Sequence, residues 1–226
     1  MYRGGFLLSA VWMYLGHRLR VHHRKRIPNR GGFILASNHA SMLDPNALGV
    51  AICKRELHFM ARSTLFKPAW FGWLLRSVNS HPIVRGNGPD QDWDAFVRLV
   101  QSGRVLLIFP EGTRTEDGNL QRGKSGFGRL VHLARVPVYT AYIEGSFAAW
   151  PKGGKFRLRP VTVTFGNEVP LQDLLDLPGE KRVLRQISDR VMEAIGRLRE
   201  EALREAGIQE PASTPAAGPR QLDHGN

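Results

Sequence analysis

The chain of 226 residues contains a single cysteine, Cys53, so it can form no intrachain disulfide. A disulfide-stabilised secreted fold is therefore excluded, and the lone thiol fits a cytoplasmic protein. The sequence also has no internal repeat, no P-loop and no histidine and cysteine spacing typical of a metal site. His22 and His23 have no third ligand near them in the sequence, and we interpret them as part of a basic surface. We therefore expect no metal and no cofactor.

Hydrophobic runs long enough to cross a membrane are also missing. The apolar segment Phe6–Leu15 would form a helix of about 15 Å, half of the roughly 30 Å hydrocarbon core. Arg3 precedes it, so a secretory signal peptide is one alternative, but no small-x-small cleavage site follows. A helix packed in the core is another alternative. We expect an uncleaved helix in the membrane interface, with Trp12 and Tyr14 at headgroup level.

Acidic residues are absent before Asp44, although the chain has 20 of them. The net charge is +12, and seven basic residues fall within residues 1–30. They are Arg3, Arg18, Arg20, Arg24, Lys25, Arg26 and Arg30. Such a segment attracts anionic lipids, at about 1 kcal/mol per basic residue, and would attract nucleic acid as well. Because the apolar segment adjoins it, we expect a peripheral protein at the cytoplasmic face of an anionic membrane, with no nucleic-acid partner.

The rest of the chain alternates between strand and helix patterns, which predicts an α/β fold. We expect a single domain with a mixed, mostly parallel sheet flanked by helices, plus the N-terminal interfacial helix. The predicted strands are Phe33–Ser37, Leu57–Ala61, Val105–Phe109, Val138–Ile143 and a half-buried Val161–Phe165. The predicted helices are Pro45–Ile52, Asp92–Gln101, Gly126–Leu133 and Lys181–Ala206.

We divide the chain into a membrane-surface segment, 1–29, a folded domain, 30–208, and a disordered tail, 209–226. The tail is rich in proline, alanine, glycine and serine and has no apolar periodicity. Within the domain, Lys67–Leu75 is a dense aromatic cluster. It indicates core, the wall of an acyl-chain pocket, or a lipid contact.

His39 and Asp44 lie five residues apart, as a general base and its orienting carboxylate can on one tight turn. Imidazole can accept a proton from a hydroxyl near neutral pH, and a carboxylate on its other nitrogen fixes the tautomer. No activated serine or cysteine lies nearby, so the hydroxyl would belong to the substrate. The alternative is structural, because Asp44 before Pro45 is typical of a helix cap. Asp44 has two oxygens and could do both.

A second constellation follows the apolar run Val105–Phe109, which is typical of a buried strand. The run leads into Pro110-Glu111-Gly112-Thr113-Arg114. Arg114 can bind a phosphate with two hydrogen bonds, and Gly112 lets backbone amides approach it. The alternative is an ordinary turn with an ion pair between Glu111 and Arg114.

Together these motifs resemble the PlsC-type glycerolipid acyltransferases over roughly residues 30 to 170. The resemblance lies in Asn38-His39-x-x-x-x-Asp44 and, about seventy residues later, Phe109-Pro110-Glu111-Gly112-Thr113-Arg114. Three shorter blocks also match: Pro82-Ile83-Val84-Arg85-Gly86, Lys124-Ser125-Gly126 and Val136-Pro137-Val138. The chain departs from many members in carrying arginine, not lysine, at Arg62.

The resemblance implies acyl transfer from acyl-CoA or acyl carrier protein to a glycerol hydroxyl. His39 and Asp44 are then the catalytic residues. The predicted substrate-binding residues are Arg85, Glu111, Gly112, Thr113, Arg114 and Lys124. We assign Glu111 to orienting an arginine or a backbone loop, because a carboxylate cannot itself bind a phosphate dianion.

We expect 1-acylglycerol 3-phosphate as acceptor, with phosphatidic acid as product. Another acceptor, such as lyso-ornithine lipid, a lysophospholipid or glycerol 3-phosphate, is the first alternative. A non-catalytic lipid- or nucleic-acid-binding module is the second, and it would leave both motifs without a role.

Overall fold

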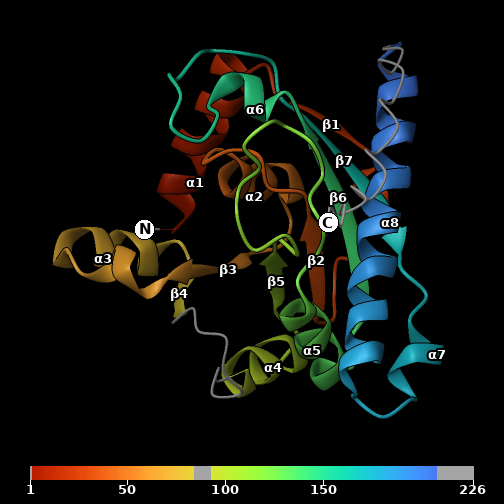
Figure 1. The fold of residues 1–226 in the computed structure, drawn as a ribbon. Coiled ribbons are helices and arrows are strands. Elements are labelled where there is room, and N and C mark those ends of the chain that lie inside the picture. Colours follow the sequence, from red (N-terminus) through yellow and green to blue (C-terminus); the bar gives the residue numbers. More distant parts are fainter. Residues whose placement is uncertain (1, 84–92, 208–226) are drawn as a thin grey trace, which may run out of the picture.

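A seven-stranded sheet forms the centre of the computed structural model, in the order β1-β7-β6-β2-β5-β3-β4 (Figure 1). The structure describes residues 2–83 and 93–207. The strands are β1 Arg20–His22, β2 Phe33–Ser37, β3 Leu57–Arg62, β4 Ser80–Ile83, β5 Val105–Ile108, β6 Val138–Glu144 and β7 Thr162–Glu168. All neighbouring pairs are parallel except β6 and β7. The predicted mixed, mostly parallel α/β sheet is confirmed.

Helices cover both faces of this sheet (Figure 1). They are α1 Tyr2–Val11, α2 Asp44–Ile52, α3 Ala69–Ser77, α4 Asp94–Gln101, α5 Ser125–Ala134, α6 Ser146–Ala149, α7 Gln172–Leu175 and α8 Lys181–Glu205, with short π or 3-10 turns η1 Trp12–Gly16, η2 Arg24–Arg26 and η3 Ser63–Phe66. Apolar residues of α4, α5 and α8 form one buried cluster, and those of α2 form another.

The central strand β2 contributes to both clusters. Phe33 and Leu35 point to the α2 side, and Ile34 and Ala36 point to the side of α5 and α8. All four are buried, which explains why this strand is a continuous apolar run. Strands β2 and β5 are parallel neighbours, so the loops that follow them leave the same edge of the sheet. The two sequence motifs therefore meet there.

Strand β7 differs from the prediction of a half-buried Val161–Phe165. The side chains from Val163 to Phe165 are all buried, Thr164 among them. The physical reason is that β7 contacts α8 as well as α2, so both faces of the strand are covered. The prediction for α8 is confirmed, because its apolar residues at helical spacing are buried.

The boundary predicted at residue 30 lies inside the fold. Strand β1 pairs with β7, and Met13, Leu19 and Ile27 are buried in the cluster on the α2 side. This strand was not predicted, because Arg20–His22 lies within a basic segment without the apolar alternation typical of a strand. The tail predicted for 209–226 lies outside the described residues.

Helix α1 leaves most of its apolar side chains uncovered. Leu8 is 75% exposed and Leu15, in η1, is 77% exposed, whereas Met13 is fully buried. The alternative of a core-packed segment therefore fits Met13 but not the leucines. No helix within the described ranges is both long and apolar enough to cross a membrane.

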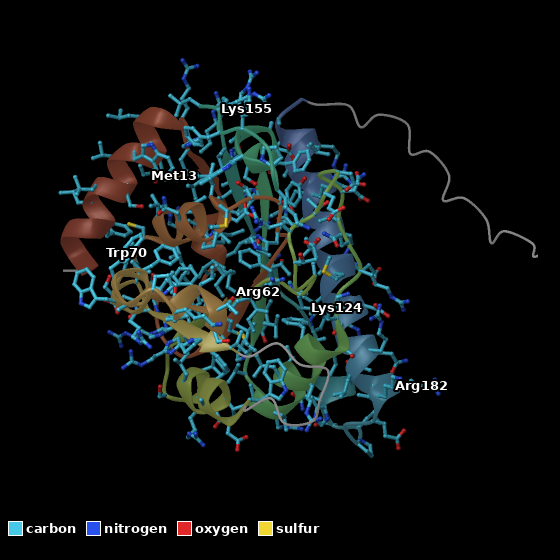
Figure 2. The ribbon with its side chains drawn as sticks, turned by 60° about the vertical axis from the view of Figure 1, so that its left-hand side comes forward. Met13, Arg62, Trp70, Lys124, Lys155 and Arg182 are labelled. Carbon is cyan, nitrogen blue, oxygen red and sulfur yellow. The ribbon has the colours of Figure 1, made fainter. Side chains whose placement is uncertain are left out.

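The aromatic cluster predicted at Lys67–Leu75 forms α3, and the core interpretation is wrong. Gly72 is the one buried residue of this helix, while Trp70 is 72% exposed and Trp73 is 56% exposed. Trp70 lies at the outer edge of the molecule, on the same side as the N-terminal helix (Figure 2). Trp73 lines the large cavity described below.

Candidate active site

His39 and Asp44 form the hydrogen-bonded pair that the first motif predicts. His39 Nδ1 lies 2.8 Å from Asp44 Oδ2, and because the carboxylate can only accept, Nδ1–H donates. This leaves the Nε2 lone pair for a substrate, on a ring that lines the cavity. No hydrogen bond to Nε2 is found within the described part of the chain. A histidine whose tautomer is fixed in this way by a carboxylate can act as a general base.

Asp44 does not cap α2, so that alternative is wrong. It is the first residue of α2, Leu43 occupies the cap position, and no side chain caps the helix. The Asp44 carboxylate instead points back and accepts the backbone N–H groups of Ala40 and Ser41, each at 2.7 Å. Asp44 is fully buried, so its position relative to His39 is fixed by the turn itself.

Two further contacts hold this turn. The side-chain amide of Asn38 donates to the carbonyl of Ile143 at 3.0 Å and accepts from its N–H at 2.8 Å, so the turn is tied to β6. The His39 ring stacks on Phe109 with 3.9 Å between ring centroids. Sequence reasoning did not assign a role to Asn38 or Phe109, although both belong to the two motifs.

Glu111 joins the two motifs through backbone groups. Its carboxylate accepts the N–H of His39 at 2.8 Å and the N–H of Gln121 at 3.1 Å. It is buried, and no ion pair with Arg114 is found among the described residues, so the alternative of a surface ion pair is wrong. Of the two partners proposed for Glu111, the structure favours the backbone loop.

Burial raises the pKa of Glu111 to about 7, and the nearby charge of Asp44 adds to the shift, while the N–H groups of His39 and Gln121 oppose it. The folded-state pKa thus lies above the ordinary value of 4.5. An acid of this kind stabilises the fold at pH values below its unfolded pKa, and the contribution is lost as the pH rises through the folded pKa.

We therefore predict that the wild-type protein loses stability, relative to Glu111→Gln, as the pH rises from about 5 to about 8. Glutamine does not titrate, so the variant lacks this pH dependence. In the wild-type protein the pH-dependent loss in free energy of unfolding is at most on the order of 3 kcal/mol. Urea unfolding of both proteins at the two pH values measures it. A constant difference between the two proteins would contradict the burial of an ionisable Glu111.

The remaining motif residues lie around the same turn. Gly112 has a φ of +71°, which favours glycine, and the lysine stem of Lys124 lies beside it. The Lys124 N–H donates to the carbonyl of Pro110 at 2.8 Å. Thr113, Arg114 and Lys124 line one cavity together with His39. Arg85, the other predicted phosphate ligand, lies outside the described residues.

This cavity has a volume of about 2130 Å³. Ligand pockets for a drug-sized molecule occupy roughly 300–1,000 Å³, so the cavity is large enough for two long substrates. Apolar side chains of α2, β3, η3 and α3, and of the turn before α2, line one part of the cavity, and Arg62 at the end of β3 adds one basic group there. These apolar residues include Met42, just before α2, and Val50, Phe59, Leu65, Trp73 and Leu75. On the other side, α5 and α8 contribute the basic residues Arg129, Lys181 and Arg185 next to the apolar Phe127, Leu130 and Leu184.

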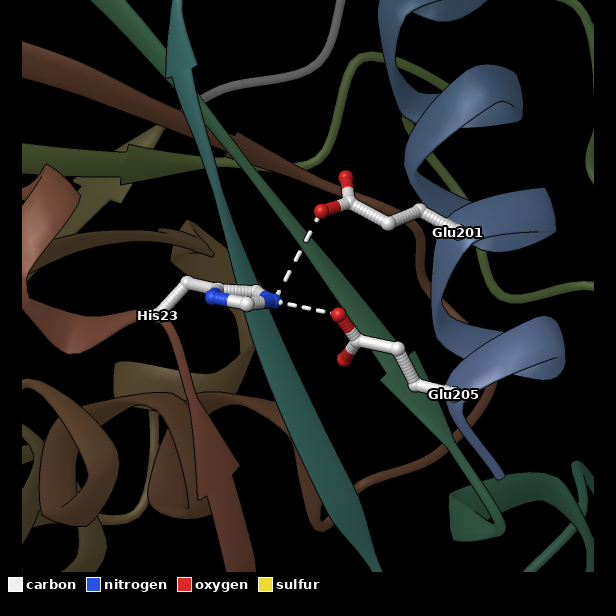
Figure 3. Close-up of side chains that lie close together, drawn as sticks. All are labelled: His23, Glu201 and Glu205. Atoms are coloured by element: carbon white, nitrogen blue, oxygen red, sulfur yellow. Dashed lines mark hydrogen bonds and ion pairs between the residues drawn. The ribbon is translucent and has the colours of Figure 1, made fainter. Parts of the chain in front are cut away.

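A cluster that could hold a metal lies elsewhere, between η2 and α8 (Figure 3). His23 Nε2 lies 2.8 Å from Glu205 and 3.6 Å from Glu201. Sequence reasoning found no third ligand for His22 and His23, because these glutamates lie far along the chain. Arg26 already binds Glu201 at 2.8 Å. The contacts therefore describe an ion-pair cluster that ties the N-terminal segment to α8.

Comparisons with known proteins identify the family of this chain. A family model described as Acyltransferase matches residues 18–144. The 1-acyl-sn-glycerol-3-phosphate acyltransferase of Bacillus subtilis is 28% identical over 183 residues, covering 79% of this chain and 88% of the relative. That of Streptococcus pneumoniae is 27% identical over 202 residues, covering 88% and 73%.

The fold is similar to that of a solved structure. The crystal structure of the 1-acyl-sn-glycerophosphate acyltransferase PlsC from Thermotoga maritima superposes with a TM-score of 0.67 at 20% identity, covering 87% of this chain and 79% of that chain. At this identity the likeness concerns the fold. The family match spans more than half of the chain and includes the His39 turn and the Glu111 loop. The protein therefore belongs to the acyltransferase family.

Proposed function

We propose that this acyltransferase moves a fatty acyl group from a thioester donor to the free hydroxyl of 1-acylglycerol 3-phosphate, giving phosphatidic acid. The observation that carries the proposal is the His39–Asp44 pair in a cavity shared with Arg114 and Lys124. The relatives' names support the choice of acceptor. The apolar side chains of α2, β3, η3 and α3 that line the cavity support a long-chain acyl group.

In this mechanism His39 Nε2 takes the proton of the acceptor hydroxyl as its oxygen attacks the thioester carbonyl. The resulting imidazolium is stabilised by Asp44 through the 2.8 Å hydrogen bond to Nδ1. The tetrahedral intermediate then breaks its carbon–sulfur bond. The proton passes from His39 to the leaving thiolate, so the products are the ester and a free thiol, and no group on the enzyme is consumed.

The acceptor's phosphate would be bound by Arg114 and Lys124, with Arg85 as a further ligand and with Gly112 and Thr113 shaping the loop. Arg114 and Lys124 have no ion-pair partner in the described residues, so their charges are available. Glu111 is a positioning residue. Its two hydrogen bonds hold the His39 backbone against the loop that precedes Lys124.

The purified protein in detergent, given lysophosphatidic acid and a long-chain acyl-CoA or acyl carrier protein, tests this proposal. We expect free thiol release that depends on the acceptor and matches the phosphatidic acid formed. Lyso-ornithine lipid, another lysophospholipid and glycerol 3-phosphate serve as competing acceptors. If the enzyme prefers one of these acceptors, lysophosphatidic acid is not its acceptor. Thiol release without any acceptor would indicate a hydrolase.

The membrane surface is the second part of the proposal. Apolar side chains on α1, η1 and α3 are exposed, among them Leu8, Leu15, Trp70 and Trp73. Helices α1 and α3 lie on one side of the molecule (Figure 1), and both contribute to the cavity through Phe6 and Trp73. A protein docked by this side, at the cytoplasmic face of an anionic membrane, would receive its acceptor directly from the lipid layer.

We predict that Leu8→Ser combined with Leu15→Ser weakens binding to anionic liposomes by about 10-fold or more. Deleting the whole segment is unsuitable, because Met13 and β1 belong to the fold. The matched control is Leu133→Ser with Leu177→Ser, two exposed leucines of α5 and the region after α7. Sedimentation at low and high salt measures binding. If both pairs behave alike, α1 is not the anchor.

A further inference from the structure

The active-site cavity has a strong excess of positive charge. Among the described residues that line it, seven are basic and none is acidic: Arg62, Arg114, Lys124, Arg129, Lys152, Lys181 and Arg185. Lys152 pairs with Glu116, and Arg185 pairs with Asp189. One acceptor phosphate accounts for Arg114 and Lys124. The cations on α5 and α8 are therefore available for a second anionic group.

A backbone contact between α5 and α8 brings these cations together. A Cβ on Gly128 would lie 1.9 Å from the carbonyl oxygen of Leu184, so only glycine permits this approach. Ser188 Oγ bridges the helices, since it accepts the N–H of Gly128 at 3.0 Å and donates to the carbonyl of Lys124 at 2.9 Å. Arg129 follows Gly128 directly.

Helix α8 contributes two of these cations, Lys181 and Arg185. Lys181 and Arg185 are four residues apart and share one face of the helix. Arg185 Nη1 donates to the carbonyl of Gly123 at 2.8 Å, which places α8 against the segment leading to Lys124. Arg129 and Lys181 have no ion pair among the described residues. The positive wall thus begins beside the catalytic loop and continues along α5, with Arg129 roughly 6 Å beyond Ser125.

The basic residues of α5 and α8 and the apolar residues of α3 line one cavity from different sides. Helix α3 lies on one side of the molecule, and α5 and α8 lie on the other (Figure 1). An acyl thioester likewise has an apolar end and an anionic end. The apolar chain lies on one side of the carbonyl, and a pantetheine arm that ends in a phosphate lies on the other. With the carbonyl at His39 and the chain along α3, the arm runs toward α5 and α8.

We propose that Arg129, Lys181 and Arg185 bind the phosphate at the end of the donor's pantetheine arm. This rests on the proposed function, since it assumes a thioester donor. Coenzyme A and acyl carrier protein both carry that phosphate, and coenzyme A carries further phosphates beside it. Arginine supplies paired hydrogen bonds to a phosphate, and lysine supplies a point charge.

The test compares Lys181→Glu with Arg182→Glu. The two residues are adjacent on α8 and the charge change is equal, but Arg182 does not line the cavity and points away from the molecule (Figure 2). We expect Lys181→Glu to raise KM for acyl-CoA by about 10-fold or more, whereas KM for acyl-pantetheine and for the lysolipid acceptor stays unchanged. Arg182→Glu should leave all three values within about 2-fold.

Acyl carrier protein as donor identifies the source of the phosphate. An increase of KM for both donors supports binding of the shared phosphate, and an increase for acyl-CoA alone supports binding of a phosphate that only coenzyme A carries. If KM for acyl-pantetheine rises as much as that for acyl-CoA, the residue shapes the cavity and the inference fails. If only the acceptor KM rises, these cations belong to the acceptor site and the inference also fails.

Calorimetric binding of coenzyme A and of pantetheine separates this inference from the proposed function, because neither measurement needs an acceptor or a reaction. The intact wild-type protein should bind coenzyme A more tightly than pantetheine, and Lys181→Glu should remove that difference. Equal affinity of the wild-type protein for both ligands would overturn the donor-phosphate site even if phosphatidic acid is formed. If the enzyme proves to use another acceptor, the proposed acceptor is wrong. The donor-phosphate site is still supported when Lys181→Glu removes the difference in affinity between coenzyme A and pantetheine.

Discussion

His39→Ala is expected to lower kcat by about 10²-fold or more, the usual scale for a general base. The variant removes the group whose Nδ1 bonds Asp44 and whose ring lines the cavity. KM for both substrates should change little, because the proposed function assigns the acceptor phosphate and the acyl chain to other groups. Acceptor-dependent thiol release measures the effect.

Folding controls make this result specific. His39 is partly exposed, and its main apolar contact is the stack on Phe109, so thermal unfolding should shift only slightly. His22→Ala is the matched variant, because His22 lies on β1 beside Glu205 and outside the cavity. We expect it to retain full turnover. A His39→Ala protein with turnover near wild type would contradict the mechanism.

Asp44→Asn tests the second half of the pair. Within the described residues, the three side-chain hydrogen bonds of Asp44 all fall on Oδ2, and the amide oxygen of asparagine can accept in the same place. The turn should therefore persist, while the negative charge that stabilises the imidazolium is lost. We expect a large fall in kcat with nearly unchanged KM.

The sequence was sufficient to predict the central elements, because their signals are local. Strand β2 is a continuous apolar run, and α8 repeats apolar residues at helical spacing, and both lie where predicted. Strands β1 and β4 were not predicted. Each is short and lies at an edge of the sheet, where polar and basic residues are tolerated.

Sequence patterns proposed candidate residues for the site but not the hydrogen bonds between them. The spacing of His39 and Asp44 indicated a pair, yet the return of the Asp44 carboxylate to Ala40 and Ser41 depends on the backbone of a turn that no pattern specifies. In the same way, Glu111 reaches the backbone of His39 across 72 positions of sequence. The chain has to fold before these partners are defined.

The basic residues that α5 and α8 contribute to the cavity could not be predicted from the sequence for a related reason. Arg129 and Lys181 lie 52 positions apart, and each on its own is an ordinary exposed charge on a helix. Their relationship depends on Gly128, whose lack of a side chain lets α5 touch α8. A glycine inside a helix was the available signal, since glycine there costs stability unless a close contact requires it.

Gly128→Ala should accordingly be among the most destabilising single substitutions outside the catalytic turn. The new Cβ would lie 1.9 Å from the Leu184 carbonyl oxygen and 2.9 Å from Ser188 Oγ. The first of these atoms is backbone, so no rotamer change relieves the clash and the helices must separate. Overpacking of a buried site costs about 1–3 kcal/mol, and opening the α5–α8 interface adds to this. Urea unfolding measures the loss.

Gly196→Ala is the matched control, because Gly196 lies within α8 and a Cβ there meets no atom within 4 Å. Alanine favours the helix over glycine by about 0.5–1 kcal/mol, so this variant should be more stable than the wild-type protein. The two substitutions thus differ in sign although their chemistry is the same. If Gly128→Ala were also stabilising, α5 and α8 could not be in backbone contact, and Arg129 and Lys181 would lose the arrangement that places them on one wall.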